Sequence, residues 1–317
     1  MDSLPTLLGI ATILPLISFF IIFTMGPKLG RAGAYIAVFA IMGAGVLSFI
    51  SLGTWCYHHF PELVSHEKHP NKDAADADDS NSEPGDTDTD SDEPAPGPAG
   101  DSEADAVLAN EDAENGDADP KAEDDGDHEA RGPPEAVTKT YWILGQFGEM
   151  QLTISCYIDG LTIMMFCMVT FIATCIHFYA IGYMHDEEHD FTDHEVTLSD
   201  GTHLTRPGRF YRFFQYLSLF CFSMLGLVLA GNVAMVFVFW ELVGACSYFL
   251  IGFYIERKSA STAANKAFIV NRVGDFGFII GLAALWSTVG TFSFGDVHEG
   301  ESVTPGLFSE LRSEENG

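Results

Sequence analysis

Six long apolar runs alternate with shorter polar segments along the chain. A bilayer core is crossed by about 20 helical residues at a rise of 1.5 Å each. Six buried core helices of this kind would leave no amphipathic shell to cover them in 317 residues. We therefore predict an all-α, polytopic membrane protein of antiporter-like type with six transmembrane helices. The runs lie near Leu4–Met25, Ala32–Tyr57, Tyr157–Met184, Phe213–Ala230, Val233–Tyr254 and Ala263–Val289.

The first run is interpreted as a retained helix rather than a secretory signal. Only Asp2 and Ser3 stand between Met1 and the start of the run at Leu4, so the run lacks the positive n-region of a signal peptide. A second apolar run also follows almost at once. We expect both runs to remain in the membrane.

Basic residues fall in every second connection between the runs, which predicts the orientation. Connections rich in Lys and Arg stay in the cytoplasm. One orientation places all of these connections there, and it puts the N-terminus, the long acidic segment and the C-terminal tail outside. The basic residues are Lys28, Arg31, Arg206, Arg209, Arg212, Arg257 and Lys258.

Net charge divides the chain into two kinds of sequence. The formal charge is −30, yet 47% of the residues are hydrophobic, and more than half of the 45 acidic residues lie between Pro61 and Thr140. Such a segment cannot bury enough apolar surface to offset the entropy of ordering it. We predict helices 1 and 2 over residues 1–57, a disordered outward-facing insertion over 58–140, helices 3 to 6 over 141–290 and an outward-facing tail over 291–317.

The acidic insertion favours solvation and loose attraction of cations over a specific site. Asp86, Asp88 and Asp90 alternate as in a calcium loop. An EF-hand needs Gly at its sixth position and Glu at its twelfth, where this chain has Ser91 and Gly97. The negative charge would also repel nucleic acid, so no nucleic-acid partner is expected.

Cysteine and histidine spacing predicts no metal centre. The six cysteines show no CxxC or Cys/His pattern. Cys56 and Cys156 both fall at predicted outer helix ends, so a disulfide between them stays open. Four histidines and several carboxylates in the segment 185–208 leave a metal site open as well, although exposed side chains of these types usually interact only with water.

Glu241 is the strongest candidate for a functional residue. It lies eight residues past Val233, hence about 12 Å into a hydrocarbon core of about 30 Å. A carboxylate near the midplane must pair with a cation, contact water or bind a proton, and each option suits a proton relay. A structural ion pair between helices is the alternative interpretation.

The sixth run adds three more ionisable candidates. Lys266 lies near the predicted helix N-terminus, where the macrodipole disfavours a cation, so it could exchange a proton with Glu241; a snorkelling anchor is the alternative. Arg272 and Asp275 are three residues apart and share one helix face. They form either a structural pair or a pair that responds to protonation nearby. His177, near the end of the third run, could relay protons but fits a packed histidine better.

Several segments together resemble the L subunit (chain 5) of respiratory NADH–quinone oxidoreductase, complex I. The stretch FWELVGACSYFLIGFY over 239–254 is similar to the family's fifth helix, and NKAF over 265–268 with NRVGD over 271–275 is similar to its sixth. The segments DGL at 159–161 and IHFYA at 176–180 fit its third helix. The likeness covers residues 150–295 well and the first two runs loosely, and the acidic insertion is not part of the family pattern.

The resemblance implies an antiporter-like subunit of a redox-driven proton pump in a bacterial cytoplasmic membrane. Glu241 would match the family's helix-5 glutamate, which modulates a pumping lysine, and Arg272 and Asp275 would match positions tied to activity. Other subunits would bind NADH, FMN, the iron–sulfur clusters and quinone, so no cofactor, metal or small-molecule substrate is expected here. The chain shows neither a GxGxxG after a strand nor a cysteine cluster. Other membrane subunits and the lipid bilayer are the implied partners.

Two other functions remain open. The first is a subunit of a multisubunit sodium/proton antiporter or of an inorganic-carbon uptake pump, because these families share the helix-5 glutamate and helix-6 lysine. The second is an inert assembly fragment. The helices that carry the family's central pumping lysine would follow residue 317, so we expect a fragment, a truncated product or one piece of a split subunit.

Overall fold

Six helices in the part of the chain that the structure describes are long and apolar enough to cross a membrane. The computed structural model describes residues 3–60, 136–148, 150–299 and 302–311. Each of the six predicted runs corresponds to one of these helices, so the predicted membrane architecture is confirmed. The helices are α1 (Ser3–Leu29), α2 (Ala32–His59), α4 (Gly160–Tyr183), α5 (Phe210–Leu229), α6 (Val233–Ile251) and α7 (Lys258–Val289).

Five predicted helix boundaries are wrong by three to five residues. The third run was expected to begin at Tyr157, but Tyr157 and Ile158 end a strand, and α4 starts only after Asp159, whose carboxylate accepts a 2.7 Å hydrogen bond from the Thr162 backbone N–H. This side-chain cap sets the helix start, because it satisfies one of the free donors of the first turn. The fifth run was expected to reach Tyr254, but α6 ends at Ile251. Three other helices are longer than predicted: α1 ends at Leu29 rather than Met25, α5 begins at Phe210 rather than Phe213, and α7 begins at Lys258 rather than Ala263.

Three antiparallel hairpins lie outside the spans and were not predicted. Strands β1 and β2 pair from Val137 opposite Ile158 to Phe147 opposite Met150. Their apolar residues had been assigned partly to the insertion and partly to the third span. The strands are β1 (Val137–Phe147), β2 (Met150–Ile158), β3 (Phe191–Thr197), β4 (His203–Arg206), β5 (Val297–Glu299) and β6 (Ser302–Thr304); a 3-10 turn, η1 (His185–Glu188), and a short helix, α8 (Leu307–Leu311), complete the described elements.

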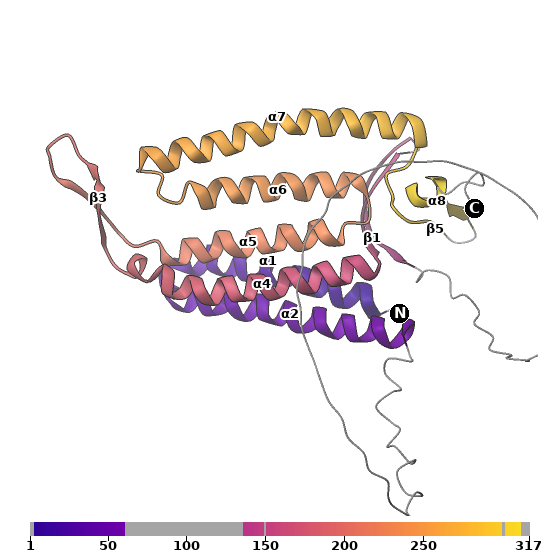
Figure 1. The fold of residues 1–317 in the computed structure, drawn as a ribbon, viewed down its shortest axis with the longest axis horizontal. Coiled ribbons are helices and arrows are strands. Elements are labelled where there is room, and N and C mark those ends of the chain that lie inside the picture. Colours follow the sequence, from indigo (N-terminus) through magenta and orange to yellow (C-terminus); the bar gives the residue numbers. More distant parts are fainter. Residues whose placement is uncertain (1–2, 61–135, 149, 300–301, 312–317) are drawn as a thin grey trace, which may run out of the picture. The chain divides into compact units, whose positions relative to one another are not determined.

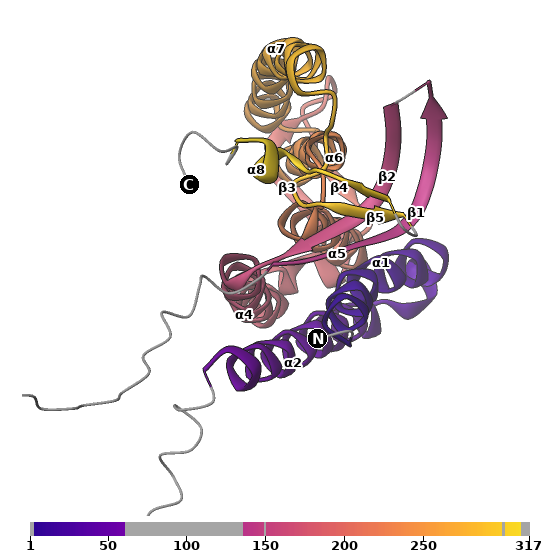
Figure 2. The ribbon, with the colours of Figure 1, turned by 90° about the vertical axis from the view of Figure 1, so that its right-hand side faces the viewer.

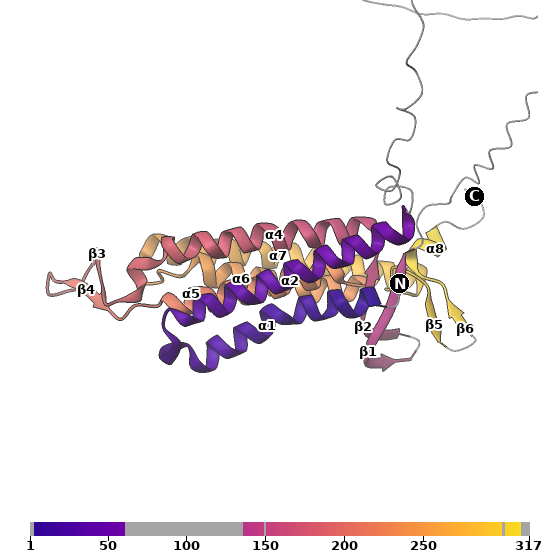
Figure 3. The same ribbon diagram turned by 90° about the horizontal axis from the view of Figure 1, so that it is seen from below.

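The first four spans form a bundle, and α6 and α7 are added to one side of it. Helix α1 packs on α2 and α5, α2 also packs on α4, and α5 packs on α6, which in turn packs on α7. Figures 1 and 2 show this succession from the indigo helices to the yellow one, and Figure 3 shows α1 and α2 crossing the bundle from below. Only 11% of the α6 span and 6% of the α7 span is buried, against 50% for α5. The faces of α6 and α7 are therefore largely uncovered in this chain.

Small residues allow the helices of the bundle to approach closely. A Cβ atom on Gly26 would collide with the ring of Tyr211, and one on Gly226 would collide with the ring of Phe239. Close backbone approach at small residues is how membrane helices gain packing contacts without a hydrophobic driving force. Gly226 thus lets α6, which carries Phe239, lie against α5.

The connections alternate between two ends of the bundle, as the basic residues predicted. At one end lie the turn between α1 and α2, the segment with η1, β3 and β4, and the turn between α6 and α7 (Figure 1). We call it the arginine-rich end, because all seven basic residues named above lie there. The hairpin β1–β2, the turn 230–232 and the segment after α7 with the hairpin β5–β6 lie at the other end (Figure 3). We call it the strand-bearing end, because two of the three hairpins that the structure describes lie there, and of these three only β3–β4 lies at the arginine-rich end.

Backbone hydrogen bonds join three segments at the strand-bearing end. Gly231 donates to the Ser155 carbonyl of β2 at 2.9 Å, and Phe294 donates to the Gly231 carbonyl at 3.0 Å. Asn232 then caps α6 with its side-chain oxygen, which accepts a 2.7 Å hydrogen bond from Met235. The turn before α6 and the segment after α7 are therefore held to the same hairpin.

The predicted insertion, 58–140, lies mostly outside the described residues. Helix α2 runs to His59 and strand β1 begins at Val137, so both edges of that range belong to ordered elements. The predicted disorder between them stays a prediction. All six cysteines are free thiols, so the disulfide between Cys56 and Cys156 that the sequence left open is absent.

Candidate functional site

A charged cavity of about 170 Å³ lies between α6 and α7, near the middle of both helices. Glu241, Gly244 and Ser247 line it from α6, and Asn271, Arg272 and Asp275 line it from α7, together with two apolar side chains. Three of the four predicted site residues therefore meet at one place. The cavity has room for several water molecules, each of which occupies about 30 Å³ in the liquid.

Packing on either side of the cavity sets the register of the two helices. Phe237 of α6 meets Phe278 of α7 with ring centroids 5.2 Å apart, and Tyr248 meets Phe268 at 5.5 Å. The two ring pairs bracket Glu241 on α6. Because the helices run in opposite directions, this register places Glu241 opposite the turn of α7 that begins at Arg272.

Arg272 joins the two carboxylates of the cavity. Its Nη1 donates a hydrogen bond to Glu241 Oε2, and the same nitrogen lies 3.2 Å from Asp275 Oδ2. The guanidinium carbon also lies 4.7 Å from the centre of the Phe268 ring, within range of a cation–π interaction. The predicted contact between Arg272 and Asp275 is confirmed. Glu241 also forms the ion pair between helices that the sequence left open as the alternative, with Arg272 as a partner that the sequence did not name.

The cluster holds two carboxylates and one guanidinium. The Asp275 side chain is only 7% exposed and that of Glu241 is 23% exposed. With both acids ionised the cluster carries one net negative charge, and binding a single proton makes it neutral. Because an uncompensated charge within a membrane span is costly, a proton bound here would relieve that cost.

One carboxylate oxygen of Glu241 has no hydrogen-bond partner in the described part of the chain and could accept this proton. Its Oε1 atom is buried and has no hydrogen-bond partner among the described residues, and the same holds for Arg272 Nε. Buried polar atoms of this kind are normally satisfied by protein or water. Glu241 lines the cavity, but this oxygen is itself buried, so it is an unsatisfied acceptor on which a proton would supply the missing hydrogen-bond donor.

Lys266 does not join this cluster. It is exposed, and no ion pair of Lys266 occurs in the part of the chain that the structure describes. Six residues separate it from Arg272, or about 9 Å along the helix axis. The structure therefore shows no contact that would support the predicted proton exchange between Lys266 and Glu241. The basic residue that contacts Glu241 is Arg272.

His177 lies away from the cavity, in the core between α4 and α5. It is fully buried, its Nδ1 is 2.7 Å from the Ala173 carbonyl oxygen, and its ring centroid is 6.4 Å from that of Phe214. These contacts support the interpretation of a packed histidine. Its Nε2 has no hydrogen-bond partner among the described residues.

The described residues contain no group of three His, Cys, Asp or Glu side chains that could hold a metal ion. In the histidine-rich segment, His194 and His203 meet edge to face with ring centroids 5.0 Å apart, as neighbours across the hairpin β3–β4. Four carboxylates of this segment pair with arginines instead, those of Glu187, Glu188, Asp193 and Glu195.

Ion pairs connect the loops at the arginine-rich end. Arg206 forms two 2.8 Å hydrogen bonds with the buried carboxylate of Glu187. Arg257, after α6, donates a 2.8 Å hydrogen bond to Asp193 of β3, and that interaction holds the pKa of Asp193 below its ordinary value. Arg209 pairs with Glu256. The segment between α4 and α5 is thus tied to the connection between α6 and α7.

Two family models match the chain. Residues 142–192 match the N-terminus of chain 5 of NADH-ubiquinone oxidoreductase (complex I), and residues 230–309 match the transmembrane region shared by NADH:quinone oxidoreductases and Mrp antiporters. The second match contains the whole cavity between α6 and α7. The predicted resemblance is confirmed for these residues.

Curated relatives agree with the family models. The chain is 43% identical over 152 residues to the NAD(P)H-quinone oxidoreductase chain 5 of Synechocystis sp., which is 48% of this chain and 19% of the relative. It is 42% identical over 154 residues to the chloroplastic NAD(P)H-quinone oxidoreductase subunit 5 of Anthoceros angustus, which is 48% of this chain and 18% of the relative. The chain thus spans about a fifth of the length of the relatives it matches.

Proposed function

We propose that this chain is part of an antiporter-like membrane subunit of a proton-translocating NADH–quinone oxidoreductase. In this proposal it takes part in coupling electron transfer from NADH to quinone with proton movement across the membrane. Other subunits of the complex bind NADH, FMN, the iron–sulfur clusters and quinone. The other membrane subunits and the lipid bilayer are its partners.

The observation that carries the proposal is the cluster of Glu241, Arg272 and Asp275 in a cavity near the middle of two candidate spans. Its net negative charge and the free Glu241 oxygen allow it to bind and release one proton. In our proposal Glu241 is the proton acceptor, Arg272 holds its carboxylate toward α7, and Asp275 shares the guanidinium. When Glu241 is protonated, its hydrogen bond with Arg272 weakens and Asp275 becomes the stronger partner of the guanidinium.

Lys266 has a different role in this proposal. Its exposed position on α7, toward the arginine-rich end, fits a contact with a segment outside this chain better than direct exchange with Glu241. It remains a candidate for proton transfer through such a segment. The uncovered face of α7 on which it lies supports this assignment.

The sodium/proton antiporter remains a second candidate, for one specific reason. The family model that matches residues 230–309 includes Mrp antiporters as well as quinone oxidoreductases. The model that matches residues 142–192, by contrast, describes complex I alone, and the curated relatives described above are quinone oxidoreductases. We therefore favour the oxidoreductase.

We also propose an orientation and a location. The seven basic residues of the arginine-rich end support a cytoplasmic position for that end, which puts the N-terminus and the strand-bearing end outside. A bacterial cytoplasmic membrane is the proposed location.

The test is to replace Glu241 with Gln in the complete complex and measure proton translocation in inverted membrane vesicles. Glutamine keeps the size of the side chain and removes its titratable proton. We expect the number of protons moved per NADH oxidised to fall by at least half, while the complex still assembles. Asp190→Asn is the matched control, because Asp190 is an exposed carboxylate outside the spans.

Three outcomes separate the candidate functions. Unchanged proton transport in the Glu241→Gln complex would refute the role of Glu241. Loss of sodium-dependent growth without loss of NADH-driven proton transport would favour the antiporter. An inert packing element in the membrane predicts that both activities and assembly stay unchanged in Glu241→Gln.

A further inference from the structure

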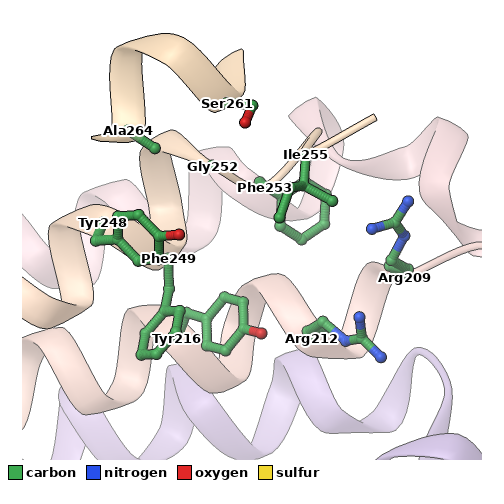
Figure 4. A pocket seen from close by; sticks show the side chains of 10 residues that line it. All are labelled: Arg209, Arg212, Tyr216, Tyr248, Phe249, Gly252, Phe253, Ile255, Ser261 and Ala264. Carbon is green, nitrogen blue, oxygen red and sulfur yellow. The ribbon is translucent and has the colours of Figure 1, made fainter. Parts of the chain in front are cut away.

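A second pocket, of about 230 Å³, opens at the arginine-rich end between α5, α6 and α7. Arg209, Arg212 and Tyr216 line it from the start of α5, and Tyr248 and Phe249 line it from the last turn of α6 (Figure 4). It lies apart from the cavity that contains Glu241 and shares no lining residue with it. Neither the proposed proton transfer nor the matched relatives assign a role to this pocket.

The two arginines of the pocket differ in their charge balance. Arg209 is 13% exposed and pairs with Glu256, so its charge is largely compensated. Arg212 is partly buried and has no ion-pair partner among the described residues, although every other arginine at this end has one. The pocket therefore carries an uncompensated positive charge that suits an anion.

Hydroxyl and apolar groups complete the walls. Tyr216, Tyr248 and Ser261 bring hydroxyl groups to the pocket from three different helices (Figure 4). Phe249, which is 42% exposed and stacks on Tyr216 at 5.1 Å, and Ile255, which is 57% exposed, supply apolar surface. One occupant that satisfies both kinds of wall is a molecule with an anionic head and an apolar chain.

The position of the pocket in the fold points to the same kind of occupant. Helix α5 begins at Phe210, α6 ends at Ile251 and α7 begins at Lys258, so the pocket lies where three spans reach their ends. At this depth a bilayer changes from acyl chains to phosphate headgroups. Tyrosine side chains are enriched at that boundary, and cytoplasmic arginines are attracted to anionic lipids there.

We propose that this pocket binds one anionic phospholipid, with Arg212 as the main contact of its phosphate. The tyrosine and serine hydroxyls donate further hydrogen bonds to the headgroup, and Phe249 and Ile255 contact the upper part of an acyl chain. Arginine suits this role because its planar fork can hold two phosphate oxygens at once. The proposal does not depend on whether the chain takes part in proton transport.

Native mass spectrometry of the full chain in a neutral detergent tests the proposal. The probes are phosphatidylglycerol, phosphatidylcholine with the same acyl chains, and glycerol 3-phosphate, which has the phosphate but no chains. We expect one site that binds phosphatidylglycerol about tenfold more tightly than phosphatidylcholine, whose phosphate charge is cancelled by a choline cation that the arginines of the pocket repel; tenfold corresponds to about 1.4 kcal/mol. Glycerol 3-phosphate should not compete at equal concentration.

Three variants give the test its controls. Arg212→Gln should lose the tenfold preference, and Arg212→Lys should keep part of it, because the ammonium retains the charge without the fork. Lys28→Gln removes one exposed positive charge from the same end, outside the pocket, and should bind phosphatidylglycerol like the wild type. Circular dichroism confirms that each variant keeps the helix content of the parent.

Several results would overturn the proposal. One is wild-type affinity for phosphatidylglycerol in a folded Arg212→Gln variant. An equal loss in Lys28→Gln would show that the attraction is only the general charge of this end. Full competition by glycerol 3-phosphate would identify a site for free phosphate, and no preference for phosphatidylglycerol in the wild type would leave the pocket to a protein partner.

Discussion

The buried ion pair between Glu187 and Arg206 gives the sharpest prediction about stability. Glu187 is 2% exposed and Arg206 is 7% exposed, and two hydrogen bonds of 2.8 Å join them. The backbone N–H of Arg209 adds a third hydrogen bond to the same carboxylate at 3.2 Å. We predict that Glu187→Gln strongly destabilises the arginine-rich end.

The magnitude follows from what the substitution leaves behind. Glutamine can accept at most one of the two arginine hydrogen bonds, and the guanidinium of Arg206 stays buried without a counter-charge. Removing one partner of a buried pair costs about 3–5 kcal/mol. The rings of Phe191 and Tyr254 lie 5.3 and 5.7 Å from the guanidinium and offset part of this loss, so we expect a value of about 3 kcal/mol, near the lower limit.

The same pair predicts how stability depends on pH. Burial alone would raise the pKa of Glu187, but the hydrogen bonds and positive charge of Arg206, with the Arg209 N–H, hold it below its ordinary value of 4.5. A carboxylate whose pKa is lower in the folded state than in the unfolded state stabilises the fold fully at pH values above its unfolded-state pKa. This stabilisation is lost as the pH falls toward the folded-state pKa. The wild type should therefore exceed Glu187→Gln in stability at pH 7, and the difference should shrink below about pH 4.5.

Unfolding in mixed micelles with increasing dodecyl sulfate, followed by circular dichroism, measures this difference at each pH. Glu195→Gln is the matched control, because Glu195 is 64% exposed and its pair with Arg257 is worth about 1 kcal/mol or less. The double variant Glu187→Leu with Arg206→Met should recover most of the loss, since apolar replacement of a whole buried pair is often neutral. A cost below about 1 kcal/mol for Glu187→Gln, or a difference that does not change with pH, would refute this reasoning.

Two further predictions concern packing and capping. Gly226→Ala should destabilise the protein by about 1–3 kcal/mol, because the new methyl group would collide with Phe239. The control is Gly281→Ala, in open space on α7, which should be neutral or slightly stabilising in the same unfolding assay. Asn232→Leu should lower the free energy of unfolding by about 2 kcal/mol, and with it the unfolding midpoint, because it removes the α6 cap and two hydrogen bonds to β2. The control is Asn265→Leu, at an exposed position of α7, which should have little effect.

The membrane spans could be predicted from the sequence because their signal is local. Each run needs only its own length and hydropathy, and the alternation of basic connections then orders the two ends. The hairpin β1–β2 could not be predicted in the same way. Its residues, such as Trp142, Ile143 and Ile154, are apolar and exposed, so their hydropathy resembles that of the spans, and the bridge that holds β2 to Ala230 joins residues remote in sequence.

The contacts of the candidate site could be predicted only where they lie within one helix. Arg272 and Asp275 lie three residues apart on one helix, so their contact follows from helix geometry alone. The contact of Glu241 with Arg272 joins residues 31 positions apart and depends on the register of α6 against α7. Aromatic pairs fix that register, and no periodicity within either helix encodes it. Lys266 was favoured as the partner because a cation near a helix N-terminus is disfavoured by the macrodipole and suits proton exchange, but this local argument could not show which residue of α7 faces Glu241.

The helices that carry the site are held at both ends but exposed along their sides. At the arginine-rich end, Arg257 binds Asp193 and Arg209 binds Glu256. At the strand-bearing end, the residues before α6 and after α7 bond to each other, with Val233 donating to Phe292 at 3.0 Å. Such a frame resists sliding of α6 against α7, so a change of charge at Glu241 should act first on side chains within the cavity. Arg272 is the cation that contacts both carboxylates. Protonation of Glu241 would therefore shift the guanidinium toward Asp275, and this shift would transmit the change of charge to the uncovered face of α7.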